Sequence, residues 1–263
     1  MRYRGIGWAV GLLLLGWSVT ARCQNLYHEQ GSGSSSYFTQ SAPLPVEEVT
    51  RRLQERNAQQ TAALVEFSGR RVYRMQYRGF PSDRDAEMVV DVTYHAPNAK
   101  EFRVVSQSGS RFLVDHIFKR LLESEQEFLN QENFQHSALT TANYDFTFAA
   151  YEATPNGAQY VLNLLPKTRN KFLYRGKIWV DAKEFAVVRI EGEPARNPSI
   201  WIKNTEVDHK YVKVNDFWLP AENHTESAIR LGGRAILSIE YKDYKITKVA
   251  DQHVSNTAPK ASK

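Results

Sequence analysis

Residues 73–94 read YRMQYRGFPSDRDAEMVVDVTY and contain two alternating segments separated by a turn. In residues 73–78, aromatic and sulfur-containing side chains alternate with Arg and Gln, and residues 88–94 repeat an alternation of apolar and polar side chains. Apolar residues at every second position are typical of a strand with one buried face. Turn-forming residues from Gly79 to Asp85 lie between the two segments, so this stretch predicts an antiparallel hairpin.

The same alternation extends toward the C-terminus. A third strand is predicted from Glu101 to Gln107, after the turn at Pro97. From Tyr144 onward, further strands are predicted near residues 144–148, 160–164, 171–181, 184–193, 200–214, 217–227 and 230–246. About ten strands joined mostly by short turns indicate a meandering antiparallel sheet, and a sheet of that width curls because twist accumulates from strand to strand.

Two helices are expected beside these strands. Pro45 is suited to open the first helix, which should last until about Ala63. The second has the apolar spacing of a helix with one broad stripe, formed by Val114, Ile117, Phe118, Leu121, Leu122, Phe128 and Leu129. A curved sheet buries its apolar face against helices or by closing on itself. The predicted fold class is therefore α+β, mainly antiparallel β: an open curved half-barrel of about ten strands with helices lidding the concave face.

The N-terminus predicts export. Two arginines precede an apolar run from Ile6 to Trp17, and small residues ending at Ala21 fit a signal-peptide cleavage site, so residues 1–21 are interpreted as a signal peptide. A membrane anchor is the alternative, although the run is shorter than the roughly 20 residues that span a bilayer. Lipidation at Cys23 is a second alternative, although Arg22 stands where a small residue is usual.

The rest of the chain divides by composition. Residues 22–43 are expected to be a flexible leader, residues 44–249 one half-barrel domain, and residues 250–263 a disordered tail. Cys23 is the only cysteine, so apolar burial rather than an internal disulfide must hold the core. The formal charge of +5, which falls to +3 when the signal peptide's two arginines are lost, is too small to favour nucleic-acid binding.

The sequence patterns predict a protein that is not an enzyme and has no metal or cofactor. The sequence contains no nucleophile elbow and no phosphate loop, and its seven histidines lack metal-ligand spacing. Glu222 and His224 would share one side of a strand, either as half of a metal site or as exposed polar residues. One basic turn is either solvated or in contact with anionic lipid head groups or an acidic partner; it contains Lys167, Arg169, Lys171, Arg175 and Lys177.

Several local strings, together with the order of elements, resemble the outer-membrane lipoprotein-sorting protein family, that is, the LolA-like superfamily of periplasmic carriers and in particular its uncharacterised bacterial branch. The resemblance covers about residues 45–247. The strings are NYDF at 143–146, YRGKIWVD at 174–181, RIEGEPA at 189–195, NPSIW at 197–201 and FWLPA at 217–221.

This resemblance implies an open antiparallel barrel with helices lidding a hydrophobic cavity. It further implies a periplasmic, monomeric carrier that binds lipid or lipoprotein acyl chains for outer-membrane lipoprotein sorting, with a membrane-bound donor or acceptor protein as a further partner. A lipid-sensing or protein-binding regulatory module of the cell envelope is the alternative. Alternation and helical spacing nominate the lipid-binding residues, each of which has a core role as its alternative: Met88, Val90, Val92, Tyr94, Phe102, Val104, Val114, Ile117, Phe118, Leu121, Tyr144, Phe146, Phe148, Tyr160, Leu162 and Leu164.

Overall fold

The computed structural model describes residues 43–129, 135–197, 199–200, 202–230 and 232–249. The predicted signal peptide, the leader up to residue 42 with its Cys23, and the predicted tail lie outside these described residues. The described elements run from Val46 to Lys248, and one sheet contains all of the strands among them.

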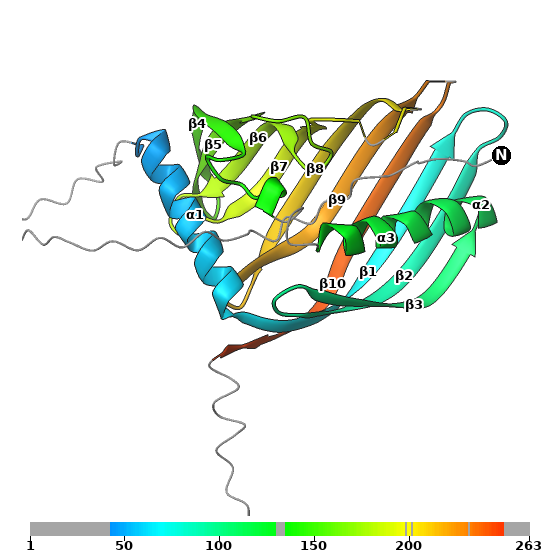
Figure 1. Ribbon diagram of the computed structural model, residues 1–263, viewed down its shortest axis with the longest axis horizontal. Helices are drawn as coiled ribbons and strands as arrows, with labels where there is room; N and C mark the ends of the chain where they lie inside the picture. The colour runs from blue at the N-terminus through cyan, green and yellow to red at the C-terminus, as the bar shows by residue number, and fades with distance from the viewer. Residues whose placement is uncertain (1–42, 130–134, 198, 201, 231, 250–263) are drawn as a thin grey trace, which may run out of the picture.

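The sheet has ten strands, and each hydrogen-bonded pair of neighbours is antiparallel (Figure 1). Its order is β3-β2-β1-β10-β9-β8-β7-β6-β5-β4, so β3 and β4 are the two edges and the sheet is open. This confirms the predicted fold class. The bounds are β1 Leu64–Arg78, β2 Arg84–His95, β3 Ala99–Gly109, β4 Tyr144–Thr154, β5 Gly157–Pro166, β6 Tyr174–Asp181, β7 Val187–Pro194, β8 Ile202–Val214, β9 Phe217–Ile229 and β10 Arg234–Lys248.

The pairing of β1 with β10 joins the first strands of the chain to the last. Tyr73 lies opposite Ile239, and Tyr77 lies opposite Ala235. The chain runs from one edge strand, β3, to the other, β4, through the helical segment between them. The short turns β1–β2, β5–β6, β7–β8 and β9–β10 therefore all lie along one rim of the antiparallel sheet.

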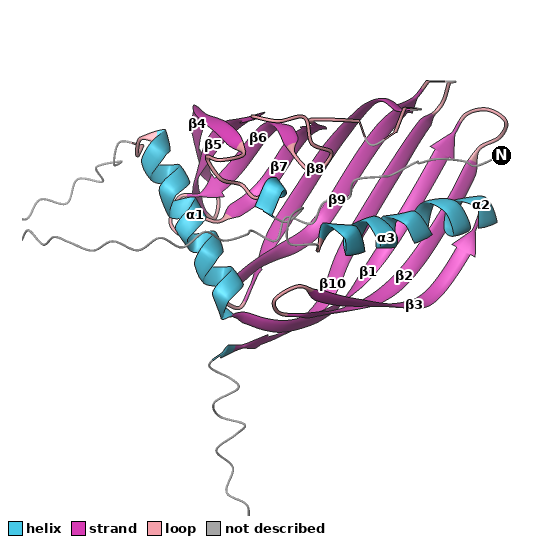
Figure 2. Ribbon diagram, viewed as in Figure 1, coloured by secondary structure: helices cyan, strands magenta, loops and turns pink. Residues whose placement is uncertain are grey.

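The helices cover the two ends of the concave face (Figure 2). Helix α1 (Val46–Ala63) begins after Pro45, whose carbonyl accepts hydrogen bonds from the first turn, and packs at the β4 end. The second helical segment consists of α2 (Arg111–Leu113), a π turn at Val114–Phe118 and α3 (Lys119–Phe128), and it crosses β1 and β2. The sheet's alternation decides what lies beneath it, because in β2 every second residue from Ala86 to Tyr94 is buried.

Candidate functional site

An apolar pocket of about 400 Å³ opens at the rim that carries the β1–β2 and β9–β10 turns. Alternation points Met75, Tyr77 and Ala235 to the same face of adjacent strands, where α2 covers them. We call this the rim pocket. Its lining residues are Met75, Tyr77, Phe80, Pro81, Arg84, Phe112, Leu113, Ile117, Ile202, Ile229 and Ala235.

Two aromatic side chains stand at the mouth of the rim pocket. Phe80 is 84% exposed and Phe112 is 48% exposed, although both are large and apolar. The Tyr77 hydroxyl donates a hydrogen bond of 2.6 Å to the Phe80 carbonyl and so fixes the turn. The Arg84 guanidinium lies 5.1 Å from the Phe112 ring centre. Grouped apolar side chains that remain exposed are typical of a surface that meets an apolar partner.

Fourteen of the nominated residues fall into three groups, and the first lies between the second helical segment and the sheet. These side chains form one apolar cluster with β1 and β10 residues, and six of them are at most 6% exposed. Ile117 also lines the rim pocket, and it is the one nominated residue that does so. The members of this group are Met88, Val90, Val92, Ile117, Phe118 and Leu121, with Phe102 and Val114 partly buried against them.

A second group lies at the far end of the sheet, where Val49 and Leu53 of α1 pack against it. It contains Tyr144, Tyr160, Leu162 and Leu164, with Phe146 partly buried beside them. Tyr94 belongs to a third, small cluster with Phe67. Val104 and Phe148 are exposed, at 44% and 47%. The structure therefore distributes the nominated residues over separate parts of the concave face.

A buried ion triad, which the sequence patterns did not reveal, links α3 to the sheet. The Glu125 carboxylate lies 2.7 Å from both the Arg71 guanidinium and the Lys100 ammonium group, and all three side chains are at most 3% exposed. Burial acts to raise the pKa of Glu125, but the two cations hold that pKa below its usual value. Burial lowers the pKa of Lys100. The signal was present in the sequence, because Arg71 shares the alternation phase of Tyr73 and Glu125 follows Leu121 by one helical turn.

Polar side chains occupy the concave face between the two large clusters. His209 on β8 and Asn223 on β9 are buried, and the His209 Nε2 and Asn223 Nδ2 atoms have no hydrogen-bond partner within the part of the chain that the structure describes. Burial lowers the pKa of His209 to about 4, so this ring is neutral at pH 7. The Thr205 and Ser227 hydroxyls share a hydrogen bond of 2.9 Å nearby.

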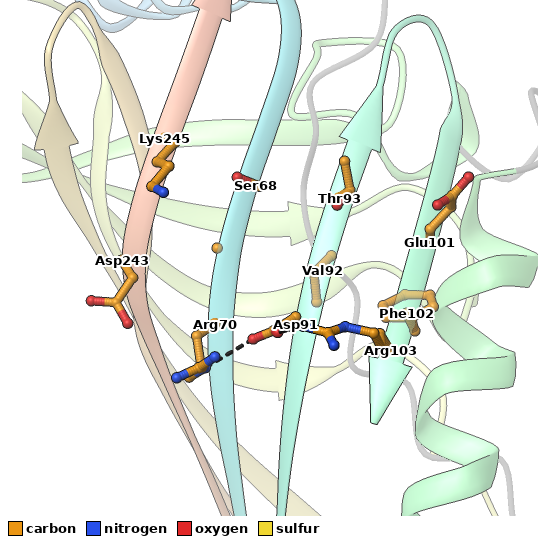
Figure 3. A pocket seen from close by; sticks show the side chains of 11 residues that line it. Ser68, Arg70, Asp91, Val92, Thr93, Glu101, Phe102, Arg103, Asp243 and Lys245 are labelled. Atoms are coloured by element: carbon orange, nitrogen blue, oxygen red, sulfur yellow. Dashed lines mark hydrogen bonds and ion pairs between the residues drawn. The ribbon is translucent and has the colours of Figure 1, made fainter. Parts of the chain in front are cut away.

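A second cleft, of about 730 Å³, lies over β10, β1, β2 and β3 (Figure 3). Arg70 points toward Asp91, with Nε 2.8 Å from Oδ1, and Arg103 contacts the other oxygen of Asp91 at 2.5 Å. These hydrogen bonds, chiefly the one from Arg70, hold the pKa of Asp91 below its usual value. The lining contains three cationic and three acidic side chains, so this balanced cleft has no surplus charge to attract an ion.

The fold divides the basic turn singled out in the sequence. Lys167 pairs with Asp145 at 3.3 Å, and Lys171 pairs with Glu127 at 3.2 Å. Arg169 and Arg175 both line a third cleft at the rim.

Glu222 and His224 are exposed on β9 and contact other side chains: Glu222 pairs with Lys210, and the His224 ring contacts the Ser238 hydroxyl. Across the described stretches, no group of three or more His, Cys, Asp or Glu side chains is arranged to hold a metal ion. Among the helices that the structure describes, none has the length and apolar character needed to cross a membrane.

No protein-family model matches the sequence, and a comparison with curated proteins finds no match. Among solved structures, a DUF1329 family protein from Desulfovibrio piger is similar at 12% identity and a TM-score of 0.38, covering 77% of this chain and 93% of that one. A LolA superfamily protein from Nitrosomonas europaea is similar at 12% identity and a TM-score of 0.35, covering 80% and 97%.

A Vibrio parahaemolyticus domain described as an outer membrane lipoprotein-sorting protein is similar at 12% identity and a TM-score of 0.36, covering 76% and 93%. At these values the function has to be argued from the chain's own residues. Two of the three descriptions name the LolA superfamily or outer membrane lipoprotein sorting, the family that the sequence strings resemble.

Proposed function

We propose that this protein is a periplasmic carrier that binds lipid or lipoprotein acyl chains in the apolar space beneath its helices and serves outer-membrane lipoprotein sorting. The observation that supports this most directly is the rim pocket, which is lined almost entirely by apolar side chains and has Phe80 and Phe112 exposed at its mouth. Its volume of about 400 Å³ lies within the range of about 300 to 1,000 Å³ that is usual for ligand pockets.

The energetics favour an acyl chain as the occupant. Moving one methylene group from water into an apolar pocket is favourable by about 0.8 kcal/mol. Burying eight methylenes therefore contributes about 6 kcal/mol of binding free energy, before the cost of immobilising the chain. A polar ligand would find few hydrogen-bonding side chains in this lining, because Tyr77 and Arg84 are the members with polar groups. The role needs apolar burial and release, and no reaction chemistry.

The nominated residues between the second helical segment and the sheet extend this proposal. Met88 and Val90 on β2 and Phe118 on the π turn are fully or almost fully buried between the helical segment and the sheet, so a long chain reaches them only if that segment moves away. The rim pocket leads toward them through Ile117, which belongs to both the pocket and the cluster. We propose that α2 and α3 act as the lid, which separates from the sheet when cargo enters.

The test is uptake of a fluorescent long-chain fatty acid by the purified exported protein, with native mass spectrometry to detect lipid that co-purifies. Phe112→Asp places a charge at the mouth of the rim pocket and is expected to weaken binding at least tenfold. Phe148→Asp is the matched variant, because Phe148 is equally exposed, at 47%, but lies on β4 at the other end of the sheet.

Circular dichroism establishes that both variants are folded. The proposal fails if the wild-type protein neither takes up the fatty acid nor carries lipid. The rim pocket is the wrong site if Phe148→Asp abolishes uptake while Phe112→Asp leaves it unchanged.

A further inference from the structure

A third cleft, of about 550 Å³, lies on the same rim as the apolar pocket and has a strongly positive lining. Its charged members are Arg169, Arg175, Arg196, Lys203, Arg230 and Glu193, which amounts to five cations and one carboxylate. We call it the basic cleft. Arg169 lies in the β5–β6 turn, Arg175 on β6 and Glu193 on β7. Arg196 lies in the β7–β8 loop, Lys203 at the start of β8 and Arg230 in the β9–β10 turn.

Local structure explains why the cations gather there. The register of β8 against β9 shifts between Ile202 and Asn204, so Ile202 stays buried while Lys203 is exposed beside it. The Asn197 side-chain amide donates hydrogen bonds to the carbonyls of Lys203, at 3.1 Å, and Ile202, at 3.4 Å, and so folds the loop back onto the start of β8. Arg230 directly follows β9 in the neighbouring turn.

Most of this positive charge is not neutralised. Arg175 has the Glu193 carboxylate at 3.6 Å. The other four cations form no ion pair with any residue that the structure describes. The basic cleft therefore carries a surplus of four positive charges, in contrast to the balanced cleft, where Arg70, Arg103 and Asp91 satisfy one another.

The basic cleft and the rim pocket adjoin. Ile202 lines both, and Ile229 of the rim pocket is followed in the chain by Arg230 of the basic cleft. Ile200 is 76% exposed and lines the basic cleft, so apolar surface continues among the cations. A site with an apolar half and a cationic half has the polarity of an amphiphile whose head group is anionic.

We propose that the basic cleft binds the phosphate of an anionic lipid head group while the acyl chain of the same molecule lies in the rim pocket. This rests on the proposed function, because it takes the rim pocket as the place of the acyl chain. Phosphate is the chemistry that suits the cleft, since guanidinium groups donate paired hydrogen bonds to phosphate oxygens and arginine supplies four of the five cations.

The test uses calorimetric titration of the exported protein with three probes, at concentrations below those that form micelles. The probes are a lysophosphatidylglycerol, the monoacylglycerol with the same chain, and glycerol 3-phosphate. We expect the lysophospholipid to bind at least tenfold more tightly than the monoacylglycerol, and glycerol 3-phosphate to bind more weakly than either. Raising the salt concentration should weaken the binding of the lysophospholipid and leave the binding of the monoacylglycerol unchanged.

The variant Lys203→Gln with Arg230→Gln should bring the lysophospholipid affinity to within about threefold of the monoacylglycerol affinity and leave the latter unchanged. The control is Lys183→Gln with Lys245→Gln, which removes the same net charge at exposed positions outside both sites and should keep the preference.

The outcomes distinguish a failure of the head-group proposal from a failure of the carrier proposal. If both chain-bearing probes bind equally, in the wild type and in both variants, the head-group site is wrong and the carrier proposal stands. If glycerol 3-phosphate binds as tightly as the lysophospholipid, the cleft is a site for free phosphate esters, and the lipid proposal is wrong. If no chain-bearing probe binds, the carrier proposal fails, and the head-group proposal fails with it.

Discussion

Replacing Glu125 by glutamine should destabilise the fold, because this carboxylate is the one anion of the buried triad. It contacts Arg71 and Lys100 at 2.7 Å, with almost no access to water. Glutamine keeps the shape of the side chain and removes its charge. The change therefore isolates the electrostatic contribution that links α3 to β1 and β3.

The size of the destabilisation follows from the two buried cations that Glu125→Gln leaves without an anion. Removing one partner of a buried ion pair costs about 3 to 5 kcal/mol, because the other charge remains in a medium that solvates it poorly. In Glu125→Gln, Arg71 stays charged, since a guanidinium does not release its proton in proteins. Lys100 has a pKa that burial already lowers, so it can become neutral and limit the loss. We expect a decrease of about 3 kcal/mol in the free energy of unfolding, near the lower end of that range.

The assay is urea unfolding followed by circular dichroism at pH 7. Glu123→Gln is the matched control, because Glu123 lies on the same helix and is exposed, and it should change stability by less than about 0.5 kcal/mol. For a domain of this size, the loss in Glu125→Gln corresponds to a decrease in Tm of roughly 6 to 12 °C.

The pH dependence gives a second measurement. The pKa of Glu125 is lower in the folded protein than its usual value, so its stabilising contribution is present above that usual value, near 4.5, and is lost as pH falls through the folded pKa. The wild type should lose this contribution in acid and Glu125→Gln should not. The reasoning is refuted if Glu125→Gln lies within 1 kcal/mol of the wild type at pH 7, or if Glu123→Gln is equally damaging.

Three further changes have expected outcomes. His209 has a pKa of about 4 in the fold against 6.5 in the unfolded chain, so its contribution is complete above pH 6.5 and lost as pH falls toward 4, amounting to about 3 kcal/mol in total. In urea titrations across that range, His209→Asn should flatten the pH dependence, and an unchanged slope, or an equal effect of His224→Asn on the neighbouring strand, would contradict the assignment. Gly176→Ala should destabilise by about 1 to 3 kcal/mol, because a Cβ there would lie 2.0 Å from the Glu191 carbonyl oxygen of β7; a Tm equal to that of the wild type would show that the strands separate freely. Leu53→Ala, on the buried face of α1, should cost about 2 to 5 kcal/mol in urea unfolding, while Gln59→Ala on the exposed side of that helix should cost almost nothing; similar losses in both would mean that α1 is not docked as described.

Much of the fold was predictable, because its signals are local. Alternation in residues 73–78 and 88–94 predicted β1 and β2 with the correct buried face, and the apolar stripe from Val114 predicted the second helical segment. A period of two or of 3.6 residues depends only on neighbours in the chain, so it can be recognised without knowing any partner strand.

The candidate sites were less predictable, because they depend on which strands become neighbours. The rim pocket exists because β1 pairs with β10, which brings Phe80 of the β1–β2 turn together with Ile229 at the end of β9. Nothing local to either segment specifies that pairing. The nominated positions could be chosen for their apolar phase alone, and so they include Val104 and Phe148, which are exposed near the edges of the sheet.

The charged clusters also depend on contacts between segments that are far apart in the chain. Of the basic turn that the sequence alone identified, Arg169 and Arg175 line the basic cleft. Lys167 and Lys171 instead pair with carboxylates from elsewhere in the fold. The cleft with surplus charge draws Arg196 and Arg230 from loops more than thirty residues apart.

What the sequence determined by itself was the type of each element and the face that it buries, since hydrophobic burial acts on the pattern carried by each segment. What only the tertiary structure decided was which rim residues meet. The order and register of the sheet are set by contacts between segments far apart in the chain, and these place Ile202 between an apolar pocket and a cationic cleft.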